Sequence, residues 1–413
     1  MTQVSVEELE RTDKLLVQDG NHGASRPVGD EILRGTERGI AHVRAADIST
    51  DGGINFAAAQ QLAESAYQRI RKGRARAGDT LLTHKGTVGL VARVPADTAD
   101  FLCSPQTTFW RSLDGETVDP GFLFYFLRSP LFQAQLKRRM HETDMAPYVS
   151  LTAQRKLWLM LPPVHEQRRI AAVLGALDDK IEHIERVGAD QLALLSLEAR
   201  RLARDHSAGR EPLADLALLI RRGISPRYTD EGCLVLNQKC IRDGRISFGP
   251  ARRHDHAAKP VEGRTLALGD VLVNSTGVGT LGRTAVVRRL PEPTIVDSHV
   301  TVVRADADVV VPEYLSYALS CRQAEIEALG EGSTGQTELS RVRLGELLIS
   351  VPSSARQENF ARVARACGAL VAAGEQEATR LRALRDELLP KLVSGNIRVS
   401  EDFDPDAATA AVA

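Results

Sequence analysis

The sequence lacks any long hydrophobic run. Its longest apolar stretch, Ile170 to Leu177, has about eight residues, whereas a helix that crosses a membrane needs about 20. The first residues, Met-Thr-Gln-Val-Ser-Val-Glu-Glu, contain neither a basic start nor an apolar segment, so they do not predict a signal peptide. We therefore expect a protein without a membrane partner.

Cysteine and net charge are also scarce. The five cysteines are an odd number and are scattered over the chain, which argues against a disulfide scaffold and favours a reducing, cytoplasmic location. The net charge of −1 argues against a simple polycationic nucleic-acid binder. Basic side chains are nevertheless concentrated locally. Residues 69–93 carry seven against one acidic residue, and residues 221–304 carry fourteen against eight.

Catalytic signatures are missing as well. The chain contains no G-x-x-x-x-G-K-[ST] nucleotide loop and no [DNS]-P-P-[FY] tetrad of the kind that amino-methyltransferases use. The segment Gly277–Gly282 fits G-x-G-x-x-G, but Thr284–Val287 after it is typical of a strand, so we expect a turn there. Cys233 and Cys240 have the wrong spacing for a zinc site. The sequence therefore predicts no catalytic residue, no metal ligand and no cofactor site in this chain.

An internal repeat is the most informative feature of these 413 residues. Four sequence blocks recur in the same order at offsets of 190 to 193 residues. Such agreement is hard to obtain by chance, so the sequence predicts two copies of one unit. The matching blocks are Gly78–Thr83 with Gly269–Asn274, Ser104–Arg111 with Asp297–Arg304, Asp119–Leu123 with Val311–Leu315, and Pro162–Gln167 with Pro352–Gln357.

Each copy changes character once. Short β-type runs broken by Gly, Pro and Asp come first, with a helix near Phe122–Arg139 or Pro312–Leu329. A long heptad pattern then follows Pro163 and Pro352, interrupted near Gly188 and Gly374. This predicts an α+β fold of two similar domains and two long antiparallel helices, related by a pseudo-twofold axis. The predicted boundaries are 1–162 for domain one, 163–206 for helix one, 207–351 for domain two, 352–395 for helix two, and 396–413 for a flexible tail.

Three groups of motifs resemble the specificity subunit of type I restriction–modification systems. The first joins Gly78-Asp79-x-Leu81-Leu82 to Gly86-Thr87-x-Gly89, and the second begins Leu161-Pro162-Pro163-x-x-Glu166-Gln167. The third runs from Leu381 through Leu389-Pro390-Lys391-Leu392-x-Ser394-Gly395 to Ile397. The resemblance covers nearly the whole chain. The second copy departs from the family pattern at Val351–Gln357, which lacks the Pro-Pro and Glu-Gln pairs.

The resemblance implies a non-catalytic subunit that acts in DNA methylation and in defence against foreign DNA. Two target recognition domains each recognise one half of a bipartite site in double-stranded DNA. The two long helices act as a spacer and dock two methyltransferase subunits, and two restriction–translocase subunits then join. S-adenosylmethionine, ATP and magnesium belong to those partners and not to this chain.

Residues at the ends of equivalent strands are the first candidates for DNA contact. They carry hydrogen-bonding side chains that differ between the copies, as expected if the two half-sites differ, and arginines nearby are candidates for phosphate contacts. The candidate DNA-binding residues are Thr83, His84, Lys85, Arg69, Arg71, Lys72, Arg74, Arg76, Gln106, Asn274, Ser275, Thr276, Arg283, His299, Arg221, Arg222, Arg252 and Arg253. The candidate partner-docking residues are Glu166, Gln167, Ile170, Leu174, Leu177, Leu381, Leu384, Leu388 and Leu389.

Two other functions remain open on the residues alone. The chain is then either a stand-alone DNA-modifying enzyme without recognisable motifs, or a protein-only scaffold that uses its long helices to join partners. Methyl transfer by the isolated chain distinguishes the enzyme, and sequence-specific, salt-dependent DNA binding distinguishes the recognition subunit from the scaffold.

Overall fold

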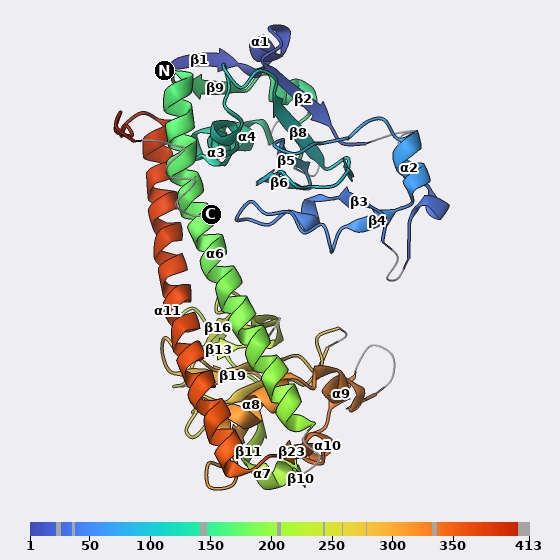
Figure 1. The fold of residues 1–413 in the computed structure, drawn as a ribbon, viewed down its shortest axis with the longest axis vertical. Coiled ribbons are helices and arrows are strands. Elements are labelled where there is room, and N and C mark those ends of the chain that lie inside the picture. The colour runs from blue at the N-terminus through green and yellow to red at the C-terminus, as the bar shows by residue number, and fades with distance from the viewer. Residues whose placement is uncertain are drawn as a thin grey trace. The chain divides into compact units, whose positions relative to one another are not determined.

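The structure is a computed structural model that describes residues 1–21, 26–34, 38–140, 147–204, 208–242, 244–257, 259–277, 279–332 and 337–403. The chain divides into two units, Met1–Glu182 with Thr379–Ala413 (unit 1) and His183–Ala378 (unit 2). Each unit contains one β-rich domain and one part of each of two long helices (Figure 1). Of the tail that we expected to be flexible, residues 404–413 lie outside the described residues.

The β-rich part of unit 1, here the first domain, extends from β1 to β9. Its strands are β1 (Thr2–Ser5), β2 (Leu15–Asp19), β3 (Ile40–Val43), β4 (Gln60–Leu62), β5 (Thr80–Lys85), β6 (Thr87–Arg93), β7 (Phe101–Cys103), β8 (Thr107–Ser112) and β9 (Trp158–Leu161). Its helices are α1 (Val6–Arg11), α2 (Glu64–Arg69), α3 (Pro120–Arg128), α4 (Pro130–Met140) and α5 (Leu151–Arg155), with 3-10 turns at Gly29–Glu31 and Ala45–Asp47.

The main sheet of the first domain has the strand order β2-β8-β5-β6, and all its neighbours are antiparallel. A smaller sheet has the order β4-β3-β7, with β3 and β7 parallel, and β1 pairs with β9. The apolar helix α3 packs on the main sheet. It begins where the Asp119 side chain accepts a hydrogen bond from the Phe122 amide and Pro120 occupies the first turn, a favoured helix start.

The β-rich part of unit 2, here the second domain, extends from β10 to β23. Its strands are β10 (Gly209–Pro212), β11 (Ala217–Arg222), β12 (Tyr228–Thr229), β13 (Cys233–Leu236), β14 (Ile241–Arg242), β15 (Arg245–Ile246), β16 (Arg252–His254), β17 (Val271–Asn274), β18 (Thr284–Val286), β19 (Thr294–Val296), β20 (Val300–Ala305), β21 (Gly330–Glu331), β22 (Glu338–Leu339) and β23 (Leu348–Val351). Its helices are α7 (Leu213–Leu216), α8 (Pro312–Ser320), α9 (Gln323–Ala328) and α10 (Arg341–Gly345), with a 3-10 turn at Gln238–Cys240.

The second domain repeats the topology of the first. Its main sheet has the order β11-β20-β17-β18, its smaller sheet has the parallel pair β13 and β19, and β10 pairs with β23. Each of these pairs corresponds to a pair in the first domain. The internal repeat that the sequence predicted is therefore present in the main sheets, the parallel pairs and the terminal strand pairs. Among the described residues, the second domain adds β12, β14, β15, β21 and β22.

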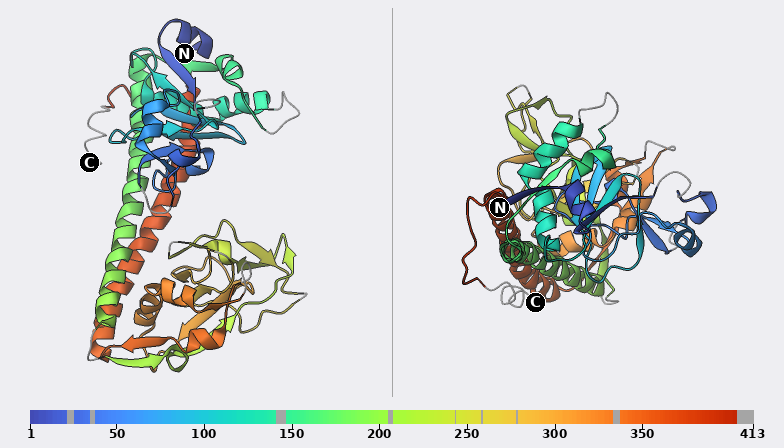
Figure 2. Two further views of the ribbon diagram at one scale, coloured as in Figure 1. Left: turned by 90° about the vertical axis from the view of Figure 1, so that its right-hand side faces the viewer. Right: turned by 90° about the horizontal axis from the view of Figure 1, so that it is seen from above.

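The two long helices are α6 (Val164–Ala203) and α11 (Ser354–Val393), each of 40 residues, which is about 60 Å at 1.5 Å per residue. Their segments lie side by side within each unit (Figures 1 and 2) and run antiparallel. In unit 1, Asp178 pairs with Arg385 while Arg169 reaches the Ser400 carbonyl. In unit 2, Gly188 faces Val371. The predicted α+β fold with two long helices is confirmed.

Gly374 explains one interruption of the heptad pattern. Neither glycine breaks its helix, because α6 continues through Gly188 and α11 through Gly374. A Cβ atom at Gly374 would lie 3.0 Å from Cγ2 of Ile184, tighter than ordinary van der Waals contact. The glycine therefore allows the close approach of α6 and α11 in unit 2.

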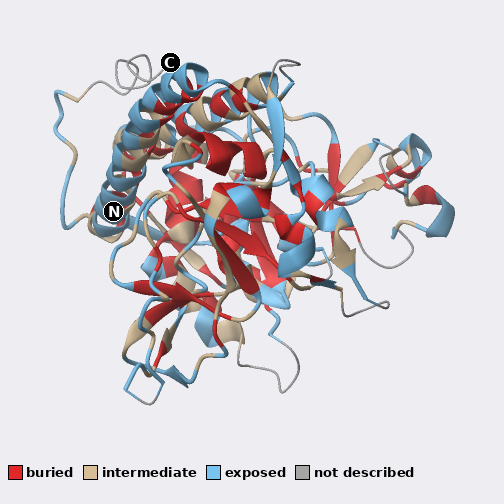
Figure 3. Cartoon of the chain, turned by 90° about the horizontal axis from the view of Figure 1, so that it is seen from below, coloured by how far each residue is buried: buried red, intermediate tan, exposed pale blue. Residues whose placement is uncertain are grey.

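A buried ion pair joins two strands of each main sheet. Asp79, just before β5, accepts two hydrogen bonds of 2.7 Å from Arg111 on β8. Asp270, just before β17, accepts two of the same length from Arg304 on β20. The hydrogen bond to Asp270 raises the pKa of Arg304. Both carboxylates lie in the buried part of the domains, which Figure 3 shows concentrated on the strands.

We expect Asp79→Ala and Asp270→Ala to lower the free energy of unfolding of their own domains by similar amounts. Each substitution leaves the guanidinium group of Arg111 or Arg304 without its carboxylate partner. Breaking a buried pair costs about 3–5 kcal/mol, and the lower end applies because both arginines are partly exposed. Urea unfolding of each variant measures the loss. Asp308→Ala, at an exposed position, is the control, and a loss in one domain alone would contradict the equivalence of the two pairs.

Candidate nucleic-acid interface

The end of β5 meets three other segments at one edge of the first domain. The His84 amide donates to the Gln106 carbonyl, and the Val149 amide donates to the His84 carbonyl, both at 2.9 Å. Lys85 forms an isolated β-bridge with Tyr148. Gly20, directly after β2, donates to the carbonyl of Thr107 at 2.9 Å. Backbone hydrogen bonds thus fix four chain segments against each other at this edge.

The end of β17 meets the equivalent segments in the second domain. The Ser275 amide donates to the His299 carbonyl, and the Leu339 amide donates to the Ser275 carbonyl, both at 2.8 Å. Thr276 forms a bridge with Glu338, and Gly223 donates to the carbonyl of Val300 at 3.0 Å. The two domains therefore build one backbone frame twice.

The side chains on this shared frame differ at every position. We call these two sets the edge clusters. The first edge cluster presents Lys85, Gln106 and Tyr148 as exposed side chains, and the second presents His299 and Glu338 with Thr276 half-buried. The first edge cluster is Asp19, His84, Lys85, Gln106 and Tyr148, and the second, in the same order, is Arg222, Ser275, Thr276, His299 and Glu338.

The first edge cluster has an exposed cation, whereas the second has an ion pair. In the first, the buried His84 ring donates from Nδ1 to the Val149 carbonyl at 3.0 Å, and burial lowers its pKa, so it is neutral near pH 7. Lys85 is then the exposed cation, with its Nζ 5.9 Å from the centre of the Tyr148 ring. In the second, Arg222 forms an ion pair with Glu338, and Thr276 Oγ1 lies 2.7 Å from His299 Nδ1.

Four of the predicted strand-end residues have buried side chains: Thr83, His84, Asn274 and Ser275. Thr83 is buried and accepts a hydrogen bond from the Leu90 amide at 2.9 Å. Asn274 is buried and donates to the Gln238 carbonyl at 3.1 Å, and Ser275 hydrogen-bonds Thr301 at 2.6 Å. Of the six strand-end candidates, only Lys85 is exposed and Thr276 half-buried, so these two are the ones that the fold leaves accessible.

The basic candidates of the first domain divide by their contacts. Arg69 forms an ion pair of 2.6 Å with Glu31, and the guanidinium of Arg74 lies 4.0 Å from the centre of the Tyr67 ring. Arg71, Lys72 and Arg76 are exposed. These three therefore remain the best placed of the five for a phosphate contact.

The basic candidates of the second domain are more strongly engaged. Arg253 pairs with Glu292 at 2.8 Å, Arg283 donates to the Gly279 carbonyl at 2.7 Å, and Arg221 donates to the Gly263 carbonyl. The guanidinium of Arg252 lies 3.4 Å from the centre of the exposed Tyr228 ring. The sequence placed these arginines in one basic region but did not reveal these partners.

Sequence reasoning missed Asp19, Tyr148 and Glu338. Tyr148 and Glu338 lie far along the chain from β5 and β17, and neither belongs to a recognisable motif. They are separated by 190 residues, an offset of the internal repeat. Extending the repeat alignment past its four strong blocks would therefore have paired them.

A buried glutamine fixes the start of each long helix to its own domain. Gln167 accepts a hydrogen bond from the Asp119 amide at 2.9 Å and donates to the Pro162 carbonyl at 2.8 Å. Gln357 accepts one from the Val311 amide at 3.0 Å and donates to the Pro352 carbonyl at 2.7 Å. The second helix start lacks the Glu-Gln pair of the family pattern, yet it keeps the glutamine and both bonds.

The expected apolar docking seam of unit 1 is corrected by burial. Gln167, Ile170, Leu174 and Leu389 lie in the core, because the first domain and the two helix segments pack against them. Leu384 is 44% exposed. The half-buried candidates are Glu166, Leu177, Leu381 and Leu388.

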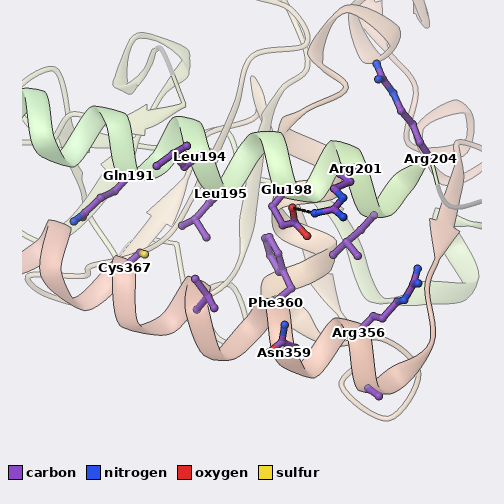
Figure 4. Close-up of a pocket in the computed structure, with 13 residues that line it drawn as sticks. Gln191, Leu194, Leu195, Glu198, Arg201, Arg204, Arg356, Asn359, Phe360 and Cys367 are labelled. Atoms are coloured by element: carbon purple, nitrogen blue, oxygen red, sulfur yellow. Dashed lines mark ion pairs between the residues drawn. The ribbon is translucent and has the colours of Figure 1, made fainter.

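Unit 2 has an apolar groove between α6 and α11 that the sequence did not indicate. Its volume is about 960 Å³, and Figure 4 shows Phe360 of α11 pointing toward α6, opposite Leu195 and Glu198. Leu194, at its border, is 65% exposed, as is Leu197 on the same helix. Unit 2 therefore exposes apolar side chains of α6 beside an open groove.

Other predicted features are placed as follows. Gly277, Gly279 and Gly282 all have positive φ, and strand β18 follows them, so the G-x-G-x-x-G segment does not lead into a helix. Within the described ranges, no three His, Cys, Asp or Glu residues are arranged to hold a metal ion. No helix in the same ranges has the length and apolar character needed to cross a membrane.

Comparison with known proteins gives structural matches only. No protein-family model matches the chain, and no curated protein matches its sequence. The type I restriction–modification S subunit from M. genitalium aligns with a TM-score of 0.53 at 16% identity, covering 95% of each chain. The two chains share a fold.

Two further solved chains align over nearly their full length with lower TM-scores. The HsdS subunit from Thermoanaerobacter tengcongensis gives 0.37 at 19% identity, covering 96% of this chain and 97% of its own. A chain from a structure on complex assembly and conformational transition of the type I system gives 0.41 at 20% identity, covering 93% and 98%. The fold assignment depends on the M. genitalium subunit alone.

We expect Gln167→Leu to reduce stability by about 1–3 kcal/mol, because it leaves the half-buried amide of Asp119 without its acceptor and removes a buried amide side chain from its partners. Gln357→Leu should do the same through the amide of Val311. Thermal or urea unfolding measures both. Glu166→Ala, at the half-buried neighbouring position, is the control. Full stability of Gln167→Leu together with loss of a partner protein would show that Gln167 is a docking residue instead.

Proposed function

We propose that this chain is the DNA-sequence-recognition subunit of a type I restriction–modification complex. Each β-rich domain recognises one half of a bipartite site in double-stranded DNA, and α6 and α11 dock two methyltransferase subunits. Two restriction–translocase subunits complete the assembly. The chain itself performs no chemical step, and its partners bind S-adenosylmethionine, ATP and magnesium.

The pair of edge clusters is the observation that carries this proposal. A fixed backbone frame holds a different set of exposed polar side chains in each domain. Base edges in the major groove are distinguished by such hydrogen-bonding groups, and two different sets recognise two different sequences. This arrangement fits recognition of an asymmetric bipartite DNA site better than a role as a protein scaffold. A scaffold that joins partners through its long helices does not need different polar side chains at the two edges.

Lys85, Gln106 and Tyr148 supply distinct contact chemistry in the first edge cluster. The ammonium of Lys85 donates to guanine acceptors or to phosphate, and an amide such as that of Gln106 matches adenine. Gln106 is itself positioned because its Oε1 lies 3.4 Å from the Ala45 amide. In the second edge cluster, the imidazole of His299 and the carboxylate of Glu338 take the equivalent places, and a carboxylate accepts from the amino group of cytosine.

The test replaces the first edge cluster by residues of the second. The variant Lys85→Thr, Gln106→His, Tyr148→Glu, co-expressed with the methyltransferase subunit, should lose about 10- to 100-fold affinity for one half-site, since a good base contact contributes about 1–3 kcal/mol. Recognition of the other half should be unchanged. Gel shifts with duplexes altered in each half measure this.

Lys137→Thr on α4, which removes the same charge from an exposed site outside the edge clusters, is the matched control. Altered preference in both halves, or in neither, would contradict the proposal. Methylation of DNA by the isolated chain would favour the stand-alone enzyme, and absence of sequence-specific binding by the assembled complex would favour the protein scaffold.

The docking part of the proposal predicts that Leu194→Glu with Leu197→Glu abolishes assembly with a methyltransferase subunit. Both leucines are exposed, so the substitutions leave the chain folded, but they place charge in an apolar contact, which costs several kcal/mol. Native mass spectrometry of the co-expressed complex measures assembly. Glu198→Gln, which lines the same groove without adding charge, is the control, and normal assembly of the double variant would remove this surface from the proposal.

A further inference from the structure

Four arginines surround one pocket of the second domain. The pocket has a volume of about 600 Å³ and lies beside the second edge cluster, because Arg222, Glu338 and the backbone of Leu339 line it. Its arginines come from three separate segments. They are Arg221 and Arg222 at the end of β11, Arg264 in the loop before β17, and Arg341 at the first position of α10.

The positive charge of this pocket is only partly balanced. Of its two carboxylates, Glu338 pairs with Arg222, and Glu331 lies 3.1 Å from Arg343. Within the described residues, Arg221, Arg264 and Arg341 have no carboxylate within 4.0 Å. Burial lowers the pKa of Arg221, and the positive charges of Arg264 and Arg304 lower it further, while Asp270 opposes them. Cations that repel one another around an open pocket favour a bound anion.

The first domain has none of these four arginines at the equivalent positions, all of which lie within the described residues. The strand pairing of β11 with β20 and of β2 with β8 makes Gln18 and Asp19 the equivalents of Arg221 and Arg222. The first position of α5 is Leu151 where α10 has Arg341.

Arg264 corresponds to Gly73 through a shared contact. Arg304 donates to the Thr265 carbonyl as Arg111 donates to that of Arg74, which aligns the residues directly before them. One domain thus places four arginines where its copy has a glutamine, an aspartate, a glycine and a leucine. Since the first domain forms the same fold without them, the arginines are not a requirement of the fold.

We propose that Arg221, Arg222, Arg264 and Arg341 bind a phosphate group of the DNA backbone beside the half-site of the second domain. This inference rests on the proposed function and adds to it a fixed phosphate site in one domain only. The planar guanidinium group presents paired donors that match phosphate oxygens, and such charge-assisted hydrogen bonds are strong. The site determines the position of the duplex and not its sequence.

The double variant Arg264→Gln, Arg341→Gln tests the site without breaking an ion pair within the described chain. The full chain, assembled with its methyltransferase subunit, is titrated with duplex DNA between 50 and 200 mM salt. Loss of one phosphate contact should lower the slope of log affinity against log salt by about 1 and weaken cognate and unrelated duplexes by the same factor. Arg264→Lys with Arg341→Lys keeps the charge and should keep the slope.

Arg210→Gln with Arg289→Gln is the matched control, because both arginines are exposed in the second domain, outside the pocket and off the long helices. A salt slope of the first variant equal to that of the wild type, with intact folding, would overturn the phosphate site. So would tight binding of inorganic phosphate that the variant loses while its DNA affinity stays unchanged, since the site then takes a free anion. If the wild-type complex itself shows no sequence-specific binding, the proposed function fails, whatever the variant does.

Discussion

A hydrogen-bonded glutamine at the start of each long helix is the constraint on which the arrangement of each unit depends. Gln167 and Gln357 each connect a helix to the carbonyl group before it and to the amide that precedes a short apolar helix of the β-rich domain. A long helix that packed only through leucines could slide or rotate by a fraction of a turn at little cost. Two hydrogen bonds from one buried side chain fix its direction, because losing either leaves a polar group unsatisfied.

The short apolar helices that these glutamines contact also help to fix the backbone of the main sheets. The apolar helices α3 and α8 are held between the main sheet and the long helix of their own unit, and the ion pairs of Asp79 and Asp270 join the strands beside them. The backbone of β5 and β17 is therefore fixed independently of the side chains at their ends. Those side chains differ between the two domains without a change in the frame that carries them.

Much of the fold was predictable from the sequence because the sequence contains two copies of one unit. The offset blocks located the main strands, the short apolar helices and both long helices, and the heptad pattern gave the helical period. The heptad pattern gave no reason for its interruptions at the two glycines, because an interruption looks the same whether a helix ends or two helices come close. Only the contact of Gly374 with Ile184 distinguishes these cases.

The candidate site was less predictable. The sequence does not show which side chains at a strand end are buried, nor which distant segments meet there. Thr83, His84, Asn274 and Ser275 are at the right place in the sequence, but the segments packed around each strand end bury their side chains. Tyr148 and Glu338 reach the edge from segments that no local pattern connects to it. Which leucines of a heptad seam remain exposed depends on what else packs there, and in unit 1 the first domain covers Ile170 and Leu174.

A duplicated frame also separates two properties that a single DNA-binding domain has to combine. Affinity for the phosphate backbone needs positive charge, whereas recognition of bases needs varied, mostly neutral polar groups. Here the first domain has Gln18 and Asp19 where the second has Arg221 and Arg222. In the proposed function, the two domains therefore place their cations differently: the second has the arginine pocket at this position, and the first has Arg71, Lys72 and Arg76 exposed elsewhere. Under the proposed function, a chain with a net charge of −1 binds DNA through charge that is concentrated at a few positions instead of spread over the surface.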